Sequence, residues 1–282
     1  MARRLPSGIH TLIAGSSRTM QLEGDCFDGP SYNASVSGAM ISDVAAIIEQ
    51  FQRGRNLKHV VLAADPWMLN AHEQAAAWNA TNINRIHAAP DWIRAQLRLG
   101  LTPHLQDFTA ATRAVLDPYR EILAPSTYQA AWKAPPANSP DSFVKQPDGS
   151  LRYPDAIVNR TEVQGGDEAR KAADEHLATT YSGFDKIDPF LAQAFEAMTA
   201  DVTARGARVT LVLAPFHPVY YDRVRHLIPA VESYYRSVAQ RQGYMVIGGY
   251  DPAAVGALAS DFFDGVHMKK TPLKRLYGCV AN

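Results

Sequence analysis

The chain has 282 residues, 46% of them hydrophobic, and its 28 basic and 28 acidic side chains give a formal net charge of +0. This balance argues against a general binder of nucleic acid or of anionic membranes, because such proteins carry a surplus of Lys and Arg. The hydrophobic content argues against wholesale disorder. The two cysteines, Cys26 and Cys279, exclude a disulfide framework and a four-cysteine zinc site and leave room for one bridge at most.

The sequence contains no apolar run of the length that a membrane-spanning helix needs, about 18 residues. Its basic start is followed by an apolar stretch that is too short and too interrupted for a secretory signal. We therefore expect no transmembrane segment and a soluble, unanchored chain, cytoplasmic as written. Its balanced charge and two cysteines are compatible with the cytoplasm and the periplasm alike, so the sequence leaves the compartment open. The sequence makes no prediction of oligomeric state.

The predicted elements begin with a short apolar strand at residues 9–14, which ends at a Gly-Ser-Ser cluster. A loop rich in Gly, Asp and Pro follows. Residues 39–51 predict a helix, because apolar side chains recur at steps of three and four residues. Residues 59–64 (HVVLAA) predict a buried strand whose unbroken apolar run is typical of parallel sheets. The order strand, helix, strand indicates a parallel sheet.

Residues 66–182 interrupt this alternation. They contain all four tryptophans, Ala-rich helical stretches, a Pro-rich segment and, at residues 146–154 (QPDGSLRYP), the Asp-Gly signal of a hairpin turn. We expect a helical cap insertion within a single domain that spans residues 1–282. The tryptophans are interpreted as core packing, with stacking on sugar rings as the alternative.

The alternation of helices and strands returns after residue 184. In chain order, the predicted elements are a helix at 189–205, a strand at 208–214, a helix at about 229–242, a strand at 244–247 and a closing helix at 272–279. The segment PFHPVYYD, which follows the strand at 208–214, is predicted to be a loop. Strands separated by helices predict an α/β fold with a doubly wound, mostly parallel sheet, that is, a flavodoxin-like three-layer α/β/α sandwich.

Three short polar segments follow strands or lie on loops: residues 15–18 (GSSR), 33–38 (NASVSG) and 264–267 (DGVH). Active sites of open α/β sheets form at the carboxyl ends of the strands. A serine hydroxyl is a weak nucleophile until a base takes its proton and a third group orients that base. Asp264 and His267 are three residues apart, so a helix-like turn places both side chains on one side.

Ser17, at the end of the first strand, is the predicted nucleophile for this Asp264 and His267 pair. The backbone N–H groups of Ser17 and Gly38 are the predicted donors to an oxyanion. This interpretation requires the Ser17 hydroxyl to lie within hydrogen-bond reach of His267.

Each segment has a simpler interpretation. The Gly-Ser-Ser cluster is also typical of a tight turn or of a phosphate-binding turn, and an Asp-x-x-His pair is typical of an exposed or capping pair. Asn33 suits an Asx-turn, and Gly38 suits a helix start. Arg18 is predicted either to clamp an anionic or sugar substrate or to pair with a neighbouring carboxylate. The histidines lack metal-ligand spacing, so we expect no metal site and no cofactor.

The same segments resemble the conserved blocks of the SGNH/GDSL hydrolase superfamily, and within it those of the DltD-like and polysaccharide O-acetyltransferase-like branch. TLIAGSSRTM is similar to the first block, YNASVSGA to the second, and DFFDGVHM to the terminal Asp-x-x-His block. The resemblance implies an SGNH hydrolase fold with Ser17 as nucleophile, Gly38 as oxyanion donor, His267 as general base and Asp264 as its orienter. Ser16 stands where the superfamily has an acidic residue.

The chain departs from the superfamily pattern at the third block. Where that block offers an Asn donor, LAADPWMLN places Asp65, and an ionised Asp cannot donate a hydrogen bond to an oxyanion. We expect Asp65 to point elsewhere, to be protonated, or to leave the oxyanion to backbone donors. Asn33, Arg18 and Asp65 complete the candidate oxyanion or substrate-binding set.

The resemblance implies a serine-dependent esterase or O-acyltransferase that acts on small acyl esters, in this branch those of cell-envelope glycans. Members of the branch act outside the cytoplasm, often behind an N-terminal anchor. Two alternatives belong to other classes: a catalytically silent binding or scaffold protein that keeps the fold, which Asp65 favours, and a nucleotide-binding domain. The nucleotide-binding alternative ranks last, because the chain lacks both a P-loop lysine and G-x-G-x-x-G.

Overall fold

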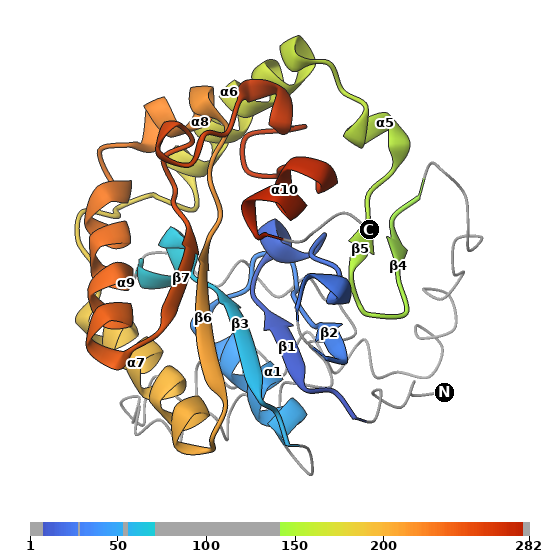
Figure 1. The fold of residues 1–282 in the computed structure, drawn as a ribbon. Helices are drawn as coiled ribbons and strands as arrows, with labels where there is room; N and C mark the ends of the chain where they lie inside the picture. Colours follow the sequence, from blue (N-terminus) through green and yellow to red (C-terminus); the bar gives the residue numbers. More distant parts are fainter. Residues whose placement is uncertain (1–7, 28, 53–55, 71–141, 279–282) are drawn as a thin grey trace, which may run out of the picture.

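The structure, a computed structural model, describes residues 8–27, 29–52, 56–70 and 142–278. Its centre is a five-stranded sheet whose neighbouring strands are all parallel, in the order β2-β1-β3-β6-β7 (Figure 1). The strands are β1 (Thr11–Ala14), β2 (Ser31–Asn33), β3 (His59–Ala63), β6 (Arg208–Leu213) and β7 (Met245–Gly248). This order is that of doubly wound flavodoxin-like sheets, so the predicted fold class is confirmed.

Helices cover the two faces and the carboxyl end of this sheet. Helices α1, α7 and α9 contact the strands from one side, whereas α6 and α8 pack against each other beyond the upper ends of β6 and β7 (Figure 1). The helices are α1 (Ile41–Gln52), α5 (Asp155–Val158), α6 (Glu162–Ala178), α7 (Pro189–Ala204), α8 (Pro218–Val224), α9 (Ile228–Gln242) and α10 (Lys270–Leu276). None of the helices in the described ranges is long and apolar enough to span a membrane.

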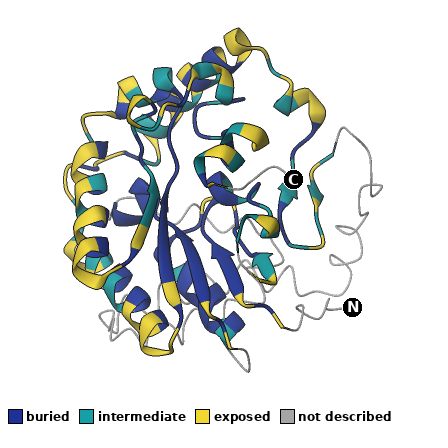
Figure 2. Ribbon diagram, in the orientation of Figure 1, coloured by how far each residue is buried: buried dark blue, intermediate teal, exposed yellow. Residues whose placement is uncertain are grey.

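Two hydrophobic cores lie on opposite faces of the sheet, because successive residues of a strand point to opposite sides. Leu12 and Val60 belong to the core beneath α1, α7 and α9, whereas Ile13 and Val61 pack with Leu273 of α10. The three central strands β1, β3 and β6 are accordingly buried along most of their length, and Figure 2 shows them in dark blue, whereas the edge strands β2 and β7 are more exposed. Burial on both faces explains the unbroken apolar run from which β3 was predicted.

Two elements differ from the sequence prediction. Ser31–Asn33 forms the edge strand β2, whereas the sequence predicted a loop followed directly by a helix opening. Three residues that include a serine and an asparagine carry no strand periodicity, and only pairing with β1 makes them a strand. Pro218–Val224 forms helix α8 where a loop was predicted, with Pro218 in the first turn and the His217 side chain capping the helix by accepting from the Val219 N–H.

The predicted hairpin is present as β4 (Val144–Lys145) and β5 (Leu151–Arg152), an antiparallel pair. Its turn touches the main sheet: the Asn33 N–H donates to the Asp148 carbonyl at 2.7 Å, and the Leu151 N–H to the Met20 carbonyl at 2.7 Å. Gly149 has a φ of +82°, and an added Cβ would lie 2.2 Å from the Asn33 oxygen. The hairpin is thereby fastened to β2 and to the turn that follows β1.

The remainder of the predicted cap is described only in part. Residues 71–141, which include Trp78, Trp92 and Trp132, lie outside the described residues. The single domain over residues 1–282 and the helical cap at about 66–182 therefore stay predictions. Trp67 is described: it is buried, and its indole N–H donates to the Ala39 carbonyl at 3.3 Å.

Candidate active site

A sharp turn after β1 presents Ser17 at the carboxyl end of the sheet. Gly15 has a φ of +156°, and an added Cβ would lie 2.2 Å from the Ala63 Cβ, so only glycine lets β1 leave the sheet so close to β3. Ser16 is fully buried, and its Oγ accepts the Arg18 N–H at 3.2 Å. This contact caps the short 3-10 turn η1 (Ser17–Thr19), whose first residue is the half-buried Ser17.

Asn33 fastens that turn to β2 rather than facing a substrate. Its side-chain amide donates to the carbonyls of Thr19 and Leu22, both at 2.8 Å, and its Oδ1 accepts the Ser35 N–H at 2.9 Å. The residue is fully buried. The predicted oxyanion or substrate-binding role of Asn33 is therefore wrong, because both amide hydrogens are engaged by backbone carbonyls. The simpler Asx-turn interpretation is the one that the contact with Ser35 supports.

Ser17 meets the predicted acid–base pair although 250 positions separate it from His267. His267 Nε2 lies 2.8 Å from Ser17 Oγ, and His267 Nδ1 lies 2.8 Å from Asp264 Oδ2. Asp264 Oδ1 accepts the backbone N–H groups of Val266 at 2.9 Å and of His267 at 2.8 Å. The sequence expectation of a hydrogen-bonded Ser17 and His267 is met in full by this geometry.

The electrostatics of Asp264 favour its charged form. Burial raises the pKa of this carboxyl, but His267 and the hydrogen bonds from the His267 ring and from the Val266 and His267 backbones outweigh burial, and the pKa is lowered. Asp264 is therefore ionised at neutral pH. An ionised carboxylate at Nδ1 holds the ring proton there and leaves Nε2 as an acceptor for the Ser17 hydroxyl.

Two aromatic rings that the sequence did not indicate surround His267. The Phe263 ring stacks on the imidazole at 5.5 Å between centroids and an interplanar angle of 8°. Tyr153, which follows strand β5, lies 5.7 Å from the same ring and 5.1 Å from Phe263. Burial, with a further contribution from the charge of Asp264, raises the pKa of the Tyr153 hydroxyl, so Tyr153 is neutral beside the imidazole. Only the docked hairpin brings it there.

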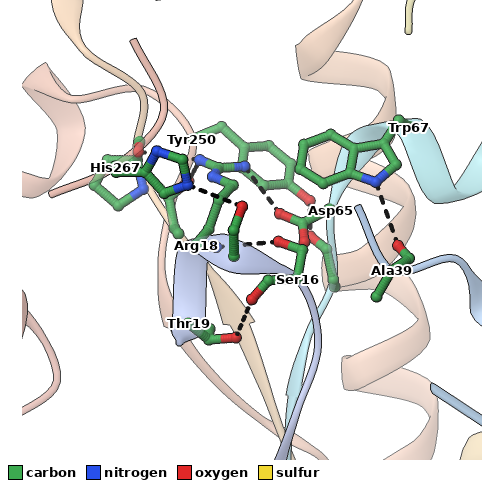
Figure 3. Close-up of polar contacts among 12 residues, drawn as sticks. Ser16, Arg18, Thr19, Ala39, Asp65, Trp67, Tyr250 and His267 are labelled. Carbon is green, nitrogen blue, oxygen red and sulfur yellow. Dashed lines mark hydrogen bonds and ion pairs between the residues drawn. The ribbon is translucent and has the colours of Figure 1, made fainter. Parts of the chain in front are cut away.

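Arg18 is buried beneath the turn and cannot clamp a substrate. Its side chain has no exposed surface, and its Nη1 lies 3.0 Å from Asp65 Oδ1. The predicted substrate-binding role is therefore wrong, and the alternative interpretation, a pair with a neighbouring carboxylate, is confirmed. Figure 3 shows the guanidinium between His267 and Asp65.

Asp65 turns toward Arg18 and Ser16 and is itself 1% exposed. Burial raises the pKa of this carboxyl, and the positive charge of Arg18 and the hydrogen bonds from Ser16 and Arg18 oppose that rise. Of the three outcomes expected for Asp65, the structure shows the first: the side chain points elsewhere. Its predicted place among the oxyanion or substrate-binding residues is therefore wrong, because Asp65 is an interior partner of Arg18.

The candidate oxyanion donors are backbone groups. The Ser17 N–H donates to no other group within the described part of the chain. Gly38 is exposed just before α1 with a φ of +61°, a conformation that glycine adopts readily. The role of Gly38 as a second donor stays a prediction. Across the described ranges, no group of three or more His, Cys, Asp or Glu side chains could hold a metal ion.

No protein-family model matches the chain, and no curated protein matches it. The solved structures that match include the crystal structure of TesA, with 13% sequence identity and a TM-score of 0.40. That match covers 96% of this chain and 95% of the other. Likeness at this level carries no argument about function, so the assignment of fold class rests on the strand order and the assignment of the site on its contacts.

Proposed function

We propose that this protein is a serine-dependent esterase or O-acyltransferase that works through an acyl-Ser17 intermediate. The observation that carries the proposal is the unbroken contact from Ser17 Oγ through His267 to Asp264, at 2.8 Å in each step. A nucleophile, a base and a group that orients the base are the parts that acyl transfer requires. Ser17 also lies just after the carboxyl end of β1, and active sites of open α/β sheets form at the carboxyl ends of strands.

In the first half-reaction, His267 Nε2 takes the Ser17 proton as Oγ attacks the carbonyl carbon of an acyl ester. The carbonyl π electrons move to the oxygen, and the Ser17 N–H is the proposed donor to it. The intermediate collapses when the bond to the leaving oxygen breaks, and His267 gives its proton to that oxygen. The products are an acyl-Ser17 ester and a free alcohol.

In the second half-reaction, His267 takes a proton from an incoming hydroxyl, and the oxygen of that hydroxyl attacks the acyl carbon. The Ser17 oxygen leaves and recovers its proton from His267. Water as the incoming group gives hydrolysis, and an alcohol gives transfer. Asp264 stabilises the imidazolium that forms in both halves, because its carboxylate is ionised and already hydrogen-bonded to Nδ1.

The proposed substrates are small acyl esters, among them those of cell-envelope glycans, which the resemblance of the GSSR and DGVH segments to the DltD-like branch supports. We further propose that the protein works outside the cytoplasm. The support for this proposal is the same resemblance, since members of that branch act outside the cytoplasm.

A catalytically silent binding or scaffold protein with the same fold is the alternative. The observation that favours it is the lack of an Asn donor in the third block, where Asp65 is committed to Arg18. This alternative predicts a folded chain whose Ser17 shows no unusual reactivity.

Intact-mass labelling with a fluorophosphonate tests the proposal. We expect one adduct on the wild-type protein and none on Ser17→Ala or His267→Ala, because an unactivated serine reacts too slowly to be labelled. Ser237→Ala, at an exposed position of α9, is the matched control and should label as the wild type does. A folded wild-type protein that takes up no adduct would contradict the esterase proposal and favour the binding protein.

A further inference from the structure

Arg18 links the segments that follow three neighbouring strands of the sheet. It follows β1, its Nη1 donates to Asp65 after β3 at 3.0 Å, and its Nη2 donates to the Pro215 carbonyl after β6, also at 3.0 Å. Nη2 also contacts the Ala214 carbonyl. The planar fork of an arginine can hold several acceptors at fixed angles, which a lysine ammonium cannot do.

The surroundings of this guanidinium are buried and largely aromatic. The Arg18 Cζ lies 3.8 Å from the centre of the Phe216 ring, so the charge stacks on an aromatic face. The β3 exit that carries Asp65 is itself held, because the Tyr235 hydroxyl donates to the Asp65 carbonyl at 3.1 Å and the Tyr250 hydroxyl donates to the Ala64 carbonyl. The Asp65 end of the pair is thereby immobilised.

The segment that follows β6 connects Arg18 to the turn that holds Asp264 and His267. Two residues after Pro215, the His217 N–H donates to the Gly265 carbonyl at 3.0 Å. Gly265 stands between Asp264 and His267. The same loop that accepts from Arg18 therefore also supports the backbone of the histidine that meets Ser17.

We propose that Arg18 and Asp65 are positioning residues that set the contact between Ser17 Oγ and His267 Nε2. Arg18 follows Ser17 directly in the chain, and it is hydrogen-bonded to the loop that supports the backbone beside His267. It therefore holds both Ser17 and His267 in position. Only the expected effect on the reaction rate rests on the proposed function; the positioning of Ser17 and His267 does not. The proposal also assigns a role to Asp65, which stands where the third block has an Asn donor, because its carboxylate anchors Arg18.

The first test compares wild type, Arg18→Lys and Asp65→Asn in the hydrolysis of p-nitrophenyl acetate by the full chain, with thermal unfolding as the check of folding. We expect kcat of Arg18→Lys to fall about 10- to 100-fold, because displacement of a reacting group by about 1 Å has effects of that size. KM should stay within about twofold, since no substrate contact is removed. Asp65→Asn should also lower kcat.

Arg205→Lys is the matched control, because Arg205 forms an exposed pair with Asp201 and should leave the rate unchanged. A folded Arg18→Lys protein with wild-type kcat would overturn the proposal. An increase of kcat in Asp65→Asn would overturn the role assigned to Asp65, because it would show that the slot works better with an amide donor.

The second test needs no catalysis and separates this proposal from the esterase proposal. The His267 ring resonances of ¹⁵N-labelled protein are recorded for wild type, Ser17→Ala and Arg18→Lys. If Arg18 sets the contact with Ser17, the Arg18→Lys resonances should move from the wild-type positions toward those of Ser17→Ala. Wild-type resonances in folded Arg18→Lys would refute the positioning role, even if the wild type hydrolyses no ester.

Discussion

Two aspartates at the carboxyl edge of the same sheet pair with basic side chains and have different roles. Asp264 pairs with His267 in a partly exposed setting, where the two side chains are 21% and 16% exposed. Asp65 pairs with Arg18 in the interior, where they are 1% and 0% exposed. The pKa of Asp264 is lowered by His267 and its hydrogen bonds, whereas the pKa of Asp65 is raised by burial.

The difference teaches that partner and exposure, rather than residue type, decide what a carboxylate does. The imidazole of His267 contacts the Ser17 hydroxyl at 2.8 Å, so the Asp264 pair is suited to moving a proton. The Asp65 pair is closed off from substrate by burial, so its role is to hold geometry. The three predictions that follow test whether activity and stability divide between the two pairs in this way.

The largest expected effect is on activity, at the partly exposed pair. Asp264→Asn should lower kcat by a factor on the order of 10³–10⁴, because an amide does not hold the His267 tautomer that accepts the Ser17 proton. Stability should change by only about 1 kcal/mol, the usual value of a single hydrogen bond. Ester hydrolysis and urea unfolding of the same samples measure both quantities. A decrease in kcat of less than tenfold would refute the role assigned to Asp264.

The next effect is on stability, at the interior pair. Asp65→Ala removes one partner of a buried ion pair and leaves the Arg18 charge uncompensated, so the free energy of unfolding should fall by about 3–5 kcal/mol. Asp201→Ala, which removes one partner of the exposed pair with Arg205, should cost about 0.5 kcal/mol or less. Urea unfolding measures both, and similar losses in the two variants would break the contrast between interior and exposed pairs.

The smallest effect is a pH dependence of stability. The folded-state pKa of Asp264 lies below its ordinary value of 3.8. The carboxylate therefore stabilises the fold fully above that value, and the stabilisation is lost as the pH falls through the lowered pKa. The difference in urea midpoint between wild type and Asp264→Asn should accordingly shrink between pH 5 and pH 2, and a difference that grows on acidification would contradict the assigned shift.

Much of the fold was predictable because its signals are local. The unbroken apolar run of β3 and the helical periodicity of α1 were recognised within one or two residues of their observed bounds. The Asp-Gly turn of the hairpin was recognised for the same reason. Strand β2 was missed, because three polar-rich residues become a strand only through pairing with β1.

The candidate site divides in the same way. The spacing of Asp264 and His267 is a local feature, and it placed the pair correctly in contact. Arg18 and Asn33 were candidates for the oxyanion or substrate-binding set, with a carboxylate pair and an Asx-turn as their alternatives, and both are buried among backbone carbonyls. Nothing in the sequence distinguishes a polar side chain that faces a cleft from one that faces the interior. Tyr153 had no signal at all, because its place beside His267 depends on where the hairpin docks.

The sequence by itself determined the alternation of strands and helices, the residue types available for acyl transfer and the turn that brings Asp264 to His267. Only the tertiary structure decided that Ser17 meets His267 across 250 positions and that Asp65 meets Arg18 across 47. The physical reason is that periodicity and turn chemistry act over a few residues. Contacts between distant residues depend on strand order and on the direction of each side chain, which only the packed sheet specifies.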